Sequence, residues 1–150
     1  MIWQFKAFND LTLDELYNIL KARVDVFVTE QECAYSELDN KDKQPQVRHL
    51  WCEDDAGQVL AYVRLLPPGL SYPQASIGRV LVAMPARGKG LAQELMIKAI
   101  THTQALWPDA GIQIGAQSYL QGFYAGLGFA RASEEYLEDG IPHLDMIYSK

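Results

Sequence analysis

The chain has 150 residues, of which 49% are hydrophobic and 21% are charged. This length predicts a single domain, 1–150, built on one core. No apolar run reaches the roughly 20 residues of a membrane-spanning helix, so we expect a soluble protein without a membrane partner. The net charge of −6 argues against nucleic acid as a partner, because phosphate binding needs a basic patch, and it mildly favours a cationic substrate.

The start of the chain, 1–6, lacks a basic segment followed by an apolar one, so no secretory signal is visible and a cytoplasmic location is expected. The two cysteines, Cys33 and Cys52, show neither Cys-x-x-Cys spacing nor a nearby histidine cluster. They predict reduced, structural thiols, with no disulfide framework and no metal site.

The N-terminal part predicts a strand followed by a helix. Residues 2–8 are mostly apolar and predict the strand. Thr12 and Glu15 have the spacing of a capping box, which places the start of the helix at Leu13. The core face of this helix is expected to comprise Leu16, Ile19, Leu20, Val24 and Phe27, with Arg23 beside it.

Apolar periodicity fails over 28–46, which is rich in carboxylates and predicts a long loop or a short helix. Two interpretations remain open: a binding or lid segment, and a solvated acidic surface, which is favoured for any single carboxylate. The runs 47–53 and 59–66 then predict a β-hairpin with its turn at 54–57.

A strand, a glycine loop and a helix follow one another in the middle of the chain. Ile77, Arg79 and Leu81 alternate with Gly78, Val80 and Val82, so residues 77–82 predict a mostly buried strand. After the loop 87–92, apolar residues recur at helical spacing and predict a helix that ends near Pro108. The glycines therefore lie where a helix begins.

That position favours an anion, because the first turn of a helix has unpaired backbone N–H groups and the positive end of the helix dipole. Gly88 and Gly90 allow close approach to the backbone, and Arg87 and Lys89 add positive charge, so the loop predicts a pyrophosphate site. The alternative is that the glycines only form a tight turn. A Walker A loop is excluded by its missing Gly-Lys-Ser/Thr ending, and a dinucleotide fingerprint is weak because Gln93 replaces the third glycine.

The C-terminal third predicts a strand over 112–116 and a short helix that ends before Gly128, which serves as its left-handed cap. Phe129 is expected to begin another strand, 138–143 to form a turn, and 144–149 to form the last strand.

Two motifs resemble those of the GNAT superfamily of N-acetyltransferases. Arg87, Gly90 and Ala92 match its acyl-CoA loop, and Tyr124 followed by Gly128-Phe129 matches the end of its second motif. The resemblance covers the whole chain and extends to the ElaA-type branch, through the strings 23–35, 78–80 and 138–143. It implies an α/β (α+β) fold in which a mixed, mostly antiparallel central sheet is flanked by helices.

The resemblance also implies transfer of an acetyl group from acetyl-CoA to a primary amine by direct attack, without an acyl-enzyme. A backbone N–H near Leu81 and Val82 would polarise the thioester carbonyl, and the Tyr124 hydroxyl would act as acid for the leaving thiolate. The alternative for Tyr124 is a core aromatic like Phe123. The alternative for the protein is a non-catalytic acyl-CoA-binding module with the same fold.

The residues expected to contact the cofactor lie in the glycine loop and the second motif: Leu81, Val82, Arg87, Gly88, Lys89, Gly90, Leu91, Ala92, Gln117 and Phe123. By family analogy, the acceptor, a small-molecule amine or a protein lysine, would contact Arg23, Glu30, Tyr35 and His143. No general base stands out among the candidates His49, His143, Glu30, Glu53 and Glu138. A homodimer is an open alternative to a monomer.

Overall fold

The computed structural model describes residues 1–148, whose eight strands form one sheet. The strands are β1 (Ile2–Ala7), β2 (Arg48–Glu53), β3 (Val59–Leu66), β4 (Ala75–Val82), β5 (Ile112–Gln117), β6 (Phe129–Arg131), β7 (Tyr136–Glu138) and β8 (Ile141–Tyr148). The helices are α1 (Leu13–Arg23), the π-helical segment η2 (Val24–Glu30), α2 (Leu91–Leu106) and α3 (Gln121–Gly126). Four 3-10 turns complete them: η1 (Phe8–Asp10), η3 (Lys41–Lys43), η4 (Met84–Ala86) and η5 (Ser118–Leu120).

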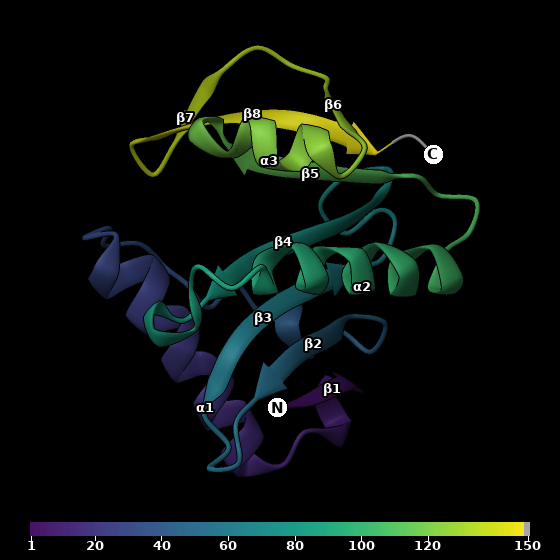
Figure 1. Cartoon of the computed structure of the whole chain (residues 1–150). Helices are drawn as coiled ribbons and strands as arrows, with labels where there is room; N and C mark the ends of the chain where they lie inside the picture. The colour runs from purple at the N-terminus through teal and green to yellow at the C-terminus, as the bar shows by residue number, and fades with distance from the viewer. Residues whose placement is uncertain (149–150) are drawn as a thin grey trace.

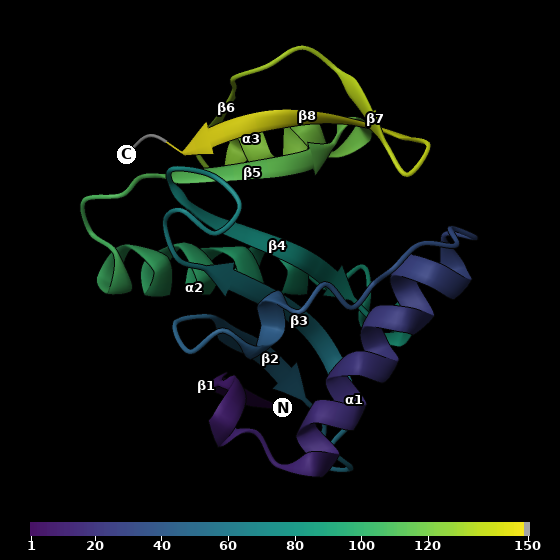
Figure 2. The ribbon, with the colours of Figure 1, turned by 180° about the vertical axis from the view of Figure 1, so that it is seen from behind.

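The strand order is β1-β2-β3-β4-β5-β8-β6, and β7 pairs with β8. Every pair is antiparallel except β4 and β5, which run parallel. Helices α2 and α3 lie on one face of this sheet and α1 on the other (Figures 1 and 2). The mixed, mostly antiparallel sheet flanked by helices confirms the predicted fold class.

Helix α1 begins where the capping box predicts. The Glu15 N–H donates to the Thr12 hydroxyl at 3.1 Å, and the Thr12 N–H donates to the Glu15 carboxylate at 3.0 Å. The helix continues as η2, whose wider turns change the side-chain register. Val26 is buried because it follows Ile19 by seven residues and lies on the same helix face, whereas Val24, predicted to lie in the core, lies off that face and is 40% exposed.

The last strand is longer than predicted. β8 begins at Ile141, and the turn that precedes it is reduced to Asp139 and Gly140, both with positive φ. Ser149, the predicted end of this strand, lies outside the described residues.

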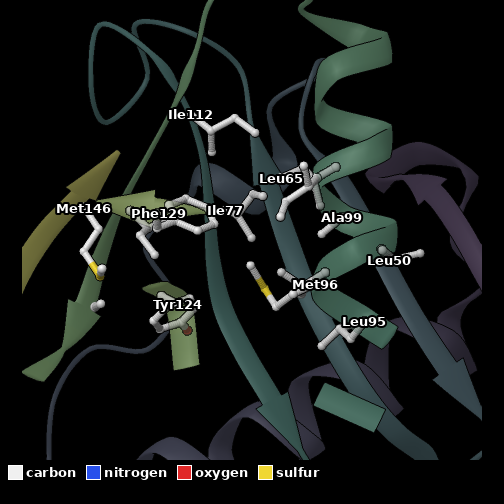
Figure 3. Close-up of a cluster of buried hydrophobic side chains, with 14 of the residues drawn as sticks. Leu50, Leu65, Ile77, Leu95, Met96, Ala99, Ile112, Tyr124, Phe129 and Met146 are labelled. Carbon is white, nitrogen blue, oxygen red and sulfur yellow. The ribbon is translucent and has the colours of Figure 1, made fainter. Parts of the chain in front are cut away.

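Two apolar clusters pack on the two faces of the sheet. Under α2 and α3, the fully buried Leu95, Met96 and Ala99 pack with strand residues such as Ile77 (Figure 3). Tyr124 and Phe129 belong to the same cluster. On the other face, under α1, the second cluster comprises Ile19, Val26, Trp51, Tyr62 and Leu81. Each cluster removes apolar surface from water on its own side of the sheet.

Strand β4 is not regular, contrary to the alternation predicted for 77–82. Tyr62 of β3 pairs with Leu81, but Arg64 pairs with Gly78, so β4 has one residue more than β3 over this stretch. This is a β-bulge at Arg79 and Val80, and Arg79 has a φ of 53°. Beyond Ala75 and Ser76, β4 no longer pairs with β5, so the two parallel strands diverge.

Candidate active site

A cavity of about 730 Å³ opens where β4 and β5 diverge. Its walls come from the bulged part of β4, from β5 and β8, from α3, and from the segment that follows α1. Six of its lining residues are sequence-predicted site residues: Glu30, Tyr35, Arg87, Gln117, Tyr124 and His143. Residues far apart in the sequence are therefore brought to one place.

Tyr124 faces this cavity from α3, whereas its neighbour Phe123 packs against the core beside it. The Tyr124 ring is held edge-on between Phe123 and Phe129, with centroid separations of 5.2 and 5.9 Å. Burial, and to a smaller degree the neighbouring Tyr119, raise the pKa of Tyr124 to about 12. Its hydroxyl therefore stays protonated around neutral pH and is available as a donor.

The glycine loop has the conformation that an anion cradle needs. Gly88 and Gly90 have φ values of 80° and 77°, and Gly90 is the N-cap of α2. The first intrahelical hydrogen bond of α2 runs from the Glu94 N–H to the Gly90 carbonyl. The backbone N–H groups just before Glu94 therefore have no acceptor within the helix. A Cβ added at Gly88 or Gly90 would meet no atom within 4 Å. Their positive φ, and not tight packing within the protein, is what favours glycine here.

The other loop residues differ in what they present. Leu91 is buried in the core, so only its backbone is placed to contact a ligand, whereas Ala92 is half-buried and the Lys89 side chain is exposed. Gly90 does not line the main cavity and borders instead a second hollow of about 310 Å³ along α2. The loop thus offers backbone donors and positive charge, which fits a phosphate group.

Arg87 joins the glycine loop to the segment after α1. Its Nε donates to the Val82 carbonyl at 2.8 Å, and its Nη2 lies 2.8 and 2.9 Å from the two carboxylate oxygens of Glu30. A predicted cofactor residue and a predicted acceptor residue therefore contact each other directly at the cavity. The Gln117 amide of β5 also lines the cavity and lies 3.5 Å from the Gln31 side chain.

The two backbone N–H groups predicted to polarise the thioester carbonyl, those of Leu81 and Val82, point in different directions. The Ala83 N–H donates to the Leu60 carbonyl of β3, so by antiparallel alternation Leu81 directs its N–H toward β3 and Val82 directs its N–H away from β3. Leu81 is therefore misassigned, while Val82 faces the side on which β5 diverges. The cavity wall itself is formed two residues earlier, by the bulge residues Arg79 and Val80.

Arg23 does not contact the cavity, contrary to its prediction as an acceptor residue. Its side chain is 0% exposed, with Nε 2.6 Å from Glu37 and Nη1 2.6 Å from Asp42. Glu37 and Asp42 are themselves buried, so the expectation of a solvated acidic segment is wrong for both. Arg23 acts structurally, by holding the segment that carries Tyr35.

Three arginines and three carboxylates form a partly buried network beside the cavity: Arg23, Arg64, Arg79, Glu37, Asp39 and Asp42. The formal charges balance, as burial requires. Arg79 Nε donates to Glu37 at 2.9 Å, and the Tyr35 hydroxyl also donates to Glu37. Glu37 thus links the β4 bulge to an aromatic residue of the cavity, a role that its position in an aperiodic acidic segment did not reveal.

The candidate bases occupy different environments. His49 is almost fully buried, with Nδ1 2.6 Å from the Tyr62 hydroxyl, and burial lowers its pKa. Glu53 accepts a hydrogen bond from Gln4 and does not line the cavity. Glu30, Glu138 and His143 line it, and His143 Nε2 lies 3.5 Å from the Glu138 carboxylate. The geometry thus reduces five candidates to three.

Within residues 1–148, no helix is long and apolar enough to cross a membrane. Over the same residues, no three His, Cys, Asp or Glu side chains are grouped so that they could hold a metal ion. Cys33 lies at the cavity and Cys52 in β2, and both are free thiols.

Comparison with known proteins defines the class. A family model described as an acetyltransferase (GNAT) domain matches residues 15–150, so the chain belongs to the GNAT acetyltransferase family. Within this family it is similar to ElaA of Escherichia coli, with 38% identity over 146 residues that cover 96% of this chain and 94% of ElaA. A UPF0039 protein of Schizosaccharomyces pombe is 39% identical over 143 residues, which cover 95% of this chain and 93% of that protein.

Solved structures agree with this placement. The crystal structure of an acyl-CoA N-acyltransferase from Pseudomonas aeruginosa superposes with a TM-score of 0.93 at 44% identity, covering 99% of both chains. The crystal structure of E. coli ElaA gives a TM-score of 0.92 at 36% identity, covering 99% of this chain and 100% of that one. These matches confirm the GNAT fold and the resemblance to ElaA inferred from the motifs.

Proposed function

We propose that this protein is an N-acetyltransferase that moves the acetyl group of acetyl-CoA directly to a primary amine. The observation that carries the proposal is that the buried Tyr124 hydroxyl group belongs to the same cavity as Arg87 of the glycine loop. One elongated ligand could thus contact the phosphate-binding loop and the proton donor together. The family membership supports an acyl-CoA as that ligand.

The residues of the loop fit the donor's pyrophosphate. The N–H groups at the start of α2 and the Arg87 guanidinium would hold it, because both combine hydrogen-bond donors with positive charge. The gap between β4 and β5 leaves β4 backbone groups free to bind the arm that carries the thioester.

Two groups would then act on the reacting atoms. The Val82 N–H, directed away from β3, would polarise the thioester carbonyl, a contribution of about 3 kcal/mol for a well-placed donor. Tyr124 would donate its hydroxyl proton toward the leaving sulfur. Because burial holds its pKa at about 12, this donor is protonated throughout the neutral range.

The acceptor class in this proposal is a small-molecule amine or a protein lysine. The net charge of −6 supports a cationic acceptor and opposes nucleic acid. A cytoplasmic setting forms part of the proposal and is supported by the two free thiols.

Calorimetric titration with acetyl-CoA, with ATP and NAD as controls, tests the donor. Mass spectrometry of spermidine, glucosamine and a lysine-containing peptide incubated with the protein and acetyl-CoA tests the transfer. We expect acetyl-CoA alone to bind and at least one amine to gain an acetyl group. Binding without transfer to any amine would favour the non-catalytic acyl-CoA-binding module instead.

A further inference from the structure

His143 and Tyr124 approach the cavity from opposite faces of the sheet. Strands β5 and β8 are paired so that Ala116 lies opposite Leu144 and Gln117 opposite His143. Ala116 and Leu144 belong to the core under α2 and α3, which also contains Tyr124. Since successive side chains of a strand alternate, His143 points to the other face, on which α1 packs.

The hydrogen bonds of His143 determine which ring nitrogen is free. Nδ1 lies 2.7 Å from the Ile141 carbonyl, which only accepts, so Nδ1 carries the hydrogen and donates it. In the neutral ring Nε2 then has the lone pair. The Glu138 carboxylate lies 3.5 Å from Nε2, and the two form an ion pair only when that nitrogen carries a proton.

The ring is also held in place. It stacks on Tyr136 at a centroid separation of 6.1 Å and an interplanar angle of 22°. The Tyr136 hydroxyl donates to Asp145 at 2.6 Å, which fixes the stacking partner. A basic nitrogen on a buried, oriented ring at the cavity wall is the arrangement that general-base catalysis needs.

We infer that His143 is the general base that deprotonates the attacking amine, an inference that rests on the proposed function. As the C–N bond forms, the amine proton passes to His143 Nε2. As the C–S bond breaks, the sulfur keeps the bonding electron pair and takes a proton from Tyr124, and solvent then restores both side chains. The amine and the leaving sulfur occupy different sides of the reacting carbon, which matches a base and an acid on opposite faces of the sheet.

The competing carboxylates are less suited to this role. Both oxygens of Glu30 already face the Arg87 guanidinium. The Glu138 side chain is 60% exposed, so water competes for its lone pairs, and its contribution acts through His143. Glu138 is therefore a positioning residue.

Two acceptors of different basicity test the inference. Ethylamine is protonated at neutral pH and must lose a proton before it attacks, whereas methoxyamine is already neutral. For His143→Gln we expect kcat/KM to fall about 100-fold with ethylamine and less than about tenfold with methoxyamine. Calorimetry should show unchanged acetyl-CoA affinity. The matched control is His102→Gln, which removes an imidazole stacked on Phe5 away from the cavity and should change neither rate.

An equal loss with both amines, or no loss, would overturn the role of His143. If His143→Gln no longer binds acetyl-CoA, Glu138→Gln is measured instead, because it alters a mostly exposed side chain. A fall in kcat/KM with ethylamine but not with methoxyamine supports His143 as the general base. No such fall overturns that role. A wild-type protein that binds acetyl-CoA but acetylates neither these amines nor the panel above would contradict the proposed function itself.

Discussion

Ile77 and Leu81 lie four residues apart in β4 yet pack on opposite faces of the sheet, Ile77 under α2 and Leu81 under α1. A regular strand would place both on the same face, because its side chains alternate. The bulge at Arg79 and Val80 supplies the extra residue that reverses the alternation. Since Arg79 and Val80 also line the cavity, this irregularity shapes the site as well as the core.

The bulge predicts an order of stability for two Arg79 variants. Both Arg79→Ala and Arg79→Gly lose the hydrogen bonds to Glu37, but only alanine must keep a Cβ at a φ of 53°. We therefore expect Arg79→Gly to be more stable than Arg79→Ala by about 1 kcal/mol. Urea unfolding measures the difference. Equal stabilities, or a more stable alanine variant, would show that the left-handed conformation does not persist.

The partly buried network of arginines and carboxylates predicts acid sensitivity. Burial alone would raise the pKa of Asp39, but its hydrogen bonds and attraction to Arg64 outweigh burial and lower the pKa to about 2. A depressed pKa stabilises the fold above the unfolded-state value near 3.9, and this stability is lost as the pH falls toward 2. Between pH 5 and 3, wild type should lose about 1 kcal/mol more unfolding free energy than Asp39→Asn. Parallel pH profiles of the two proteins would contradict this.

Much of the fold was predictable because its signals are local. The Thr12–Glu15 capping box starts α1, and Trp107-Pro108 ends α2, as the sequence indicates. The bulge was not predicted from 77–82, because the reversal arises from the pairing of β4 with β3. The core face of α1 was also placed wrongly, because Val26, seven residues after Ile19, shares its buried face, whereas Val24, which was assigned to the core, does not.

The site was predictable where a motif fixes it and not where distant charges meet. Tyr124 and Arg87, the two residues that the motifs single out, line one cavity, and their roles in it stay predictions. Burial of Glu37, by contrast, depends on arginines 14 residues before it and 42 residues after it in the chain. No local pattern distinguishes such a carboxylate from a solvated one, and for the same reason Arg23 was assigned to the acceptor and not to the network.

The contact between Glu30 and Arg87 predicts that substitutions of these two residues have opposite effects on acetyl-CoA affinity. Glu30→Gln removes a negative charge beside the proposed phosphate site and should tighten acetyl-CoA binding about two- to fivefold. Arg87→Ala removes charge-assisted hydrogen bonds and should weaken binding at least about tenfold. Asp25→Asn is the matched control, since Asp25 lies in η2 but pairs with Lys21 away from the cavity. Weaker binding in Glu30→Gln would instead mean that Glu30 orients Arg87 for the ligand.

Substitutions at Gly90 can test the proposed phosphate site separately from backbone strain. Its φ of 77° strains most side chains, so Gly90→Val would destabilise the fold as well as block the ligand. Asparagine tolerates this conformation, and Gly90→Asn should keep near-wild-type stability while weakening acetyl-CoA binding more than about tenfold. Gly69→Asn, at a φ of 88° in an equally open position, should leave binding unchanged. Normal binding by Gly90→Asn would refute a phosphate site at this loop.

The most direct test of the account is Tyr124→Phe, compared with wild type for both turnover and acetyl-CoA affinity. The hydroxyl would act on the leaving sulfur, and the ring keeps its packing against Phe123 and Phe129. We therefore predict a fall in kcat of about 100-fold or more with an unchanged calorimetric Kd. Wild-type turnover in Tyr124→Phe, or an equal loss of turnover and affinity, would contradict the proposed acid and with it the chemistry assigned to this cavity.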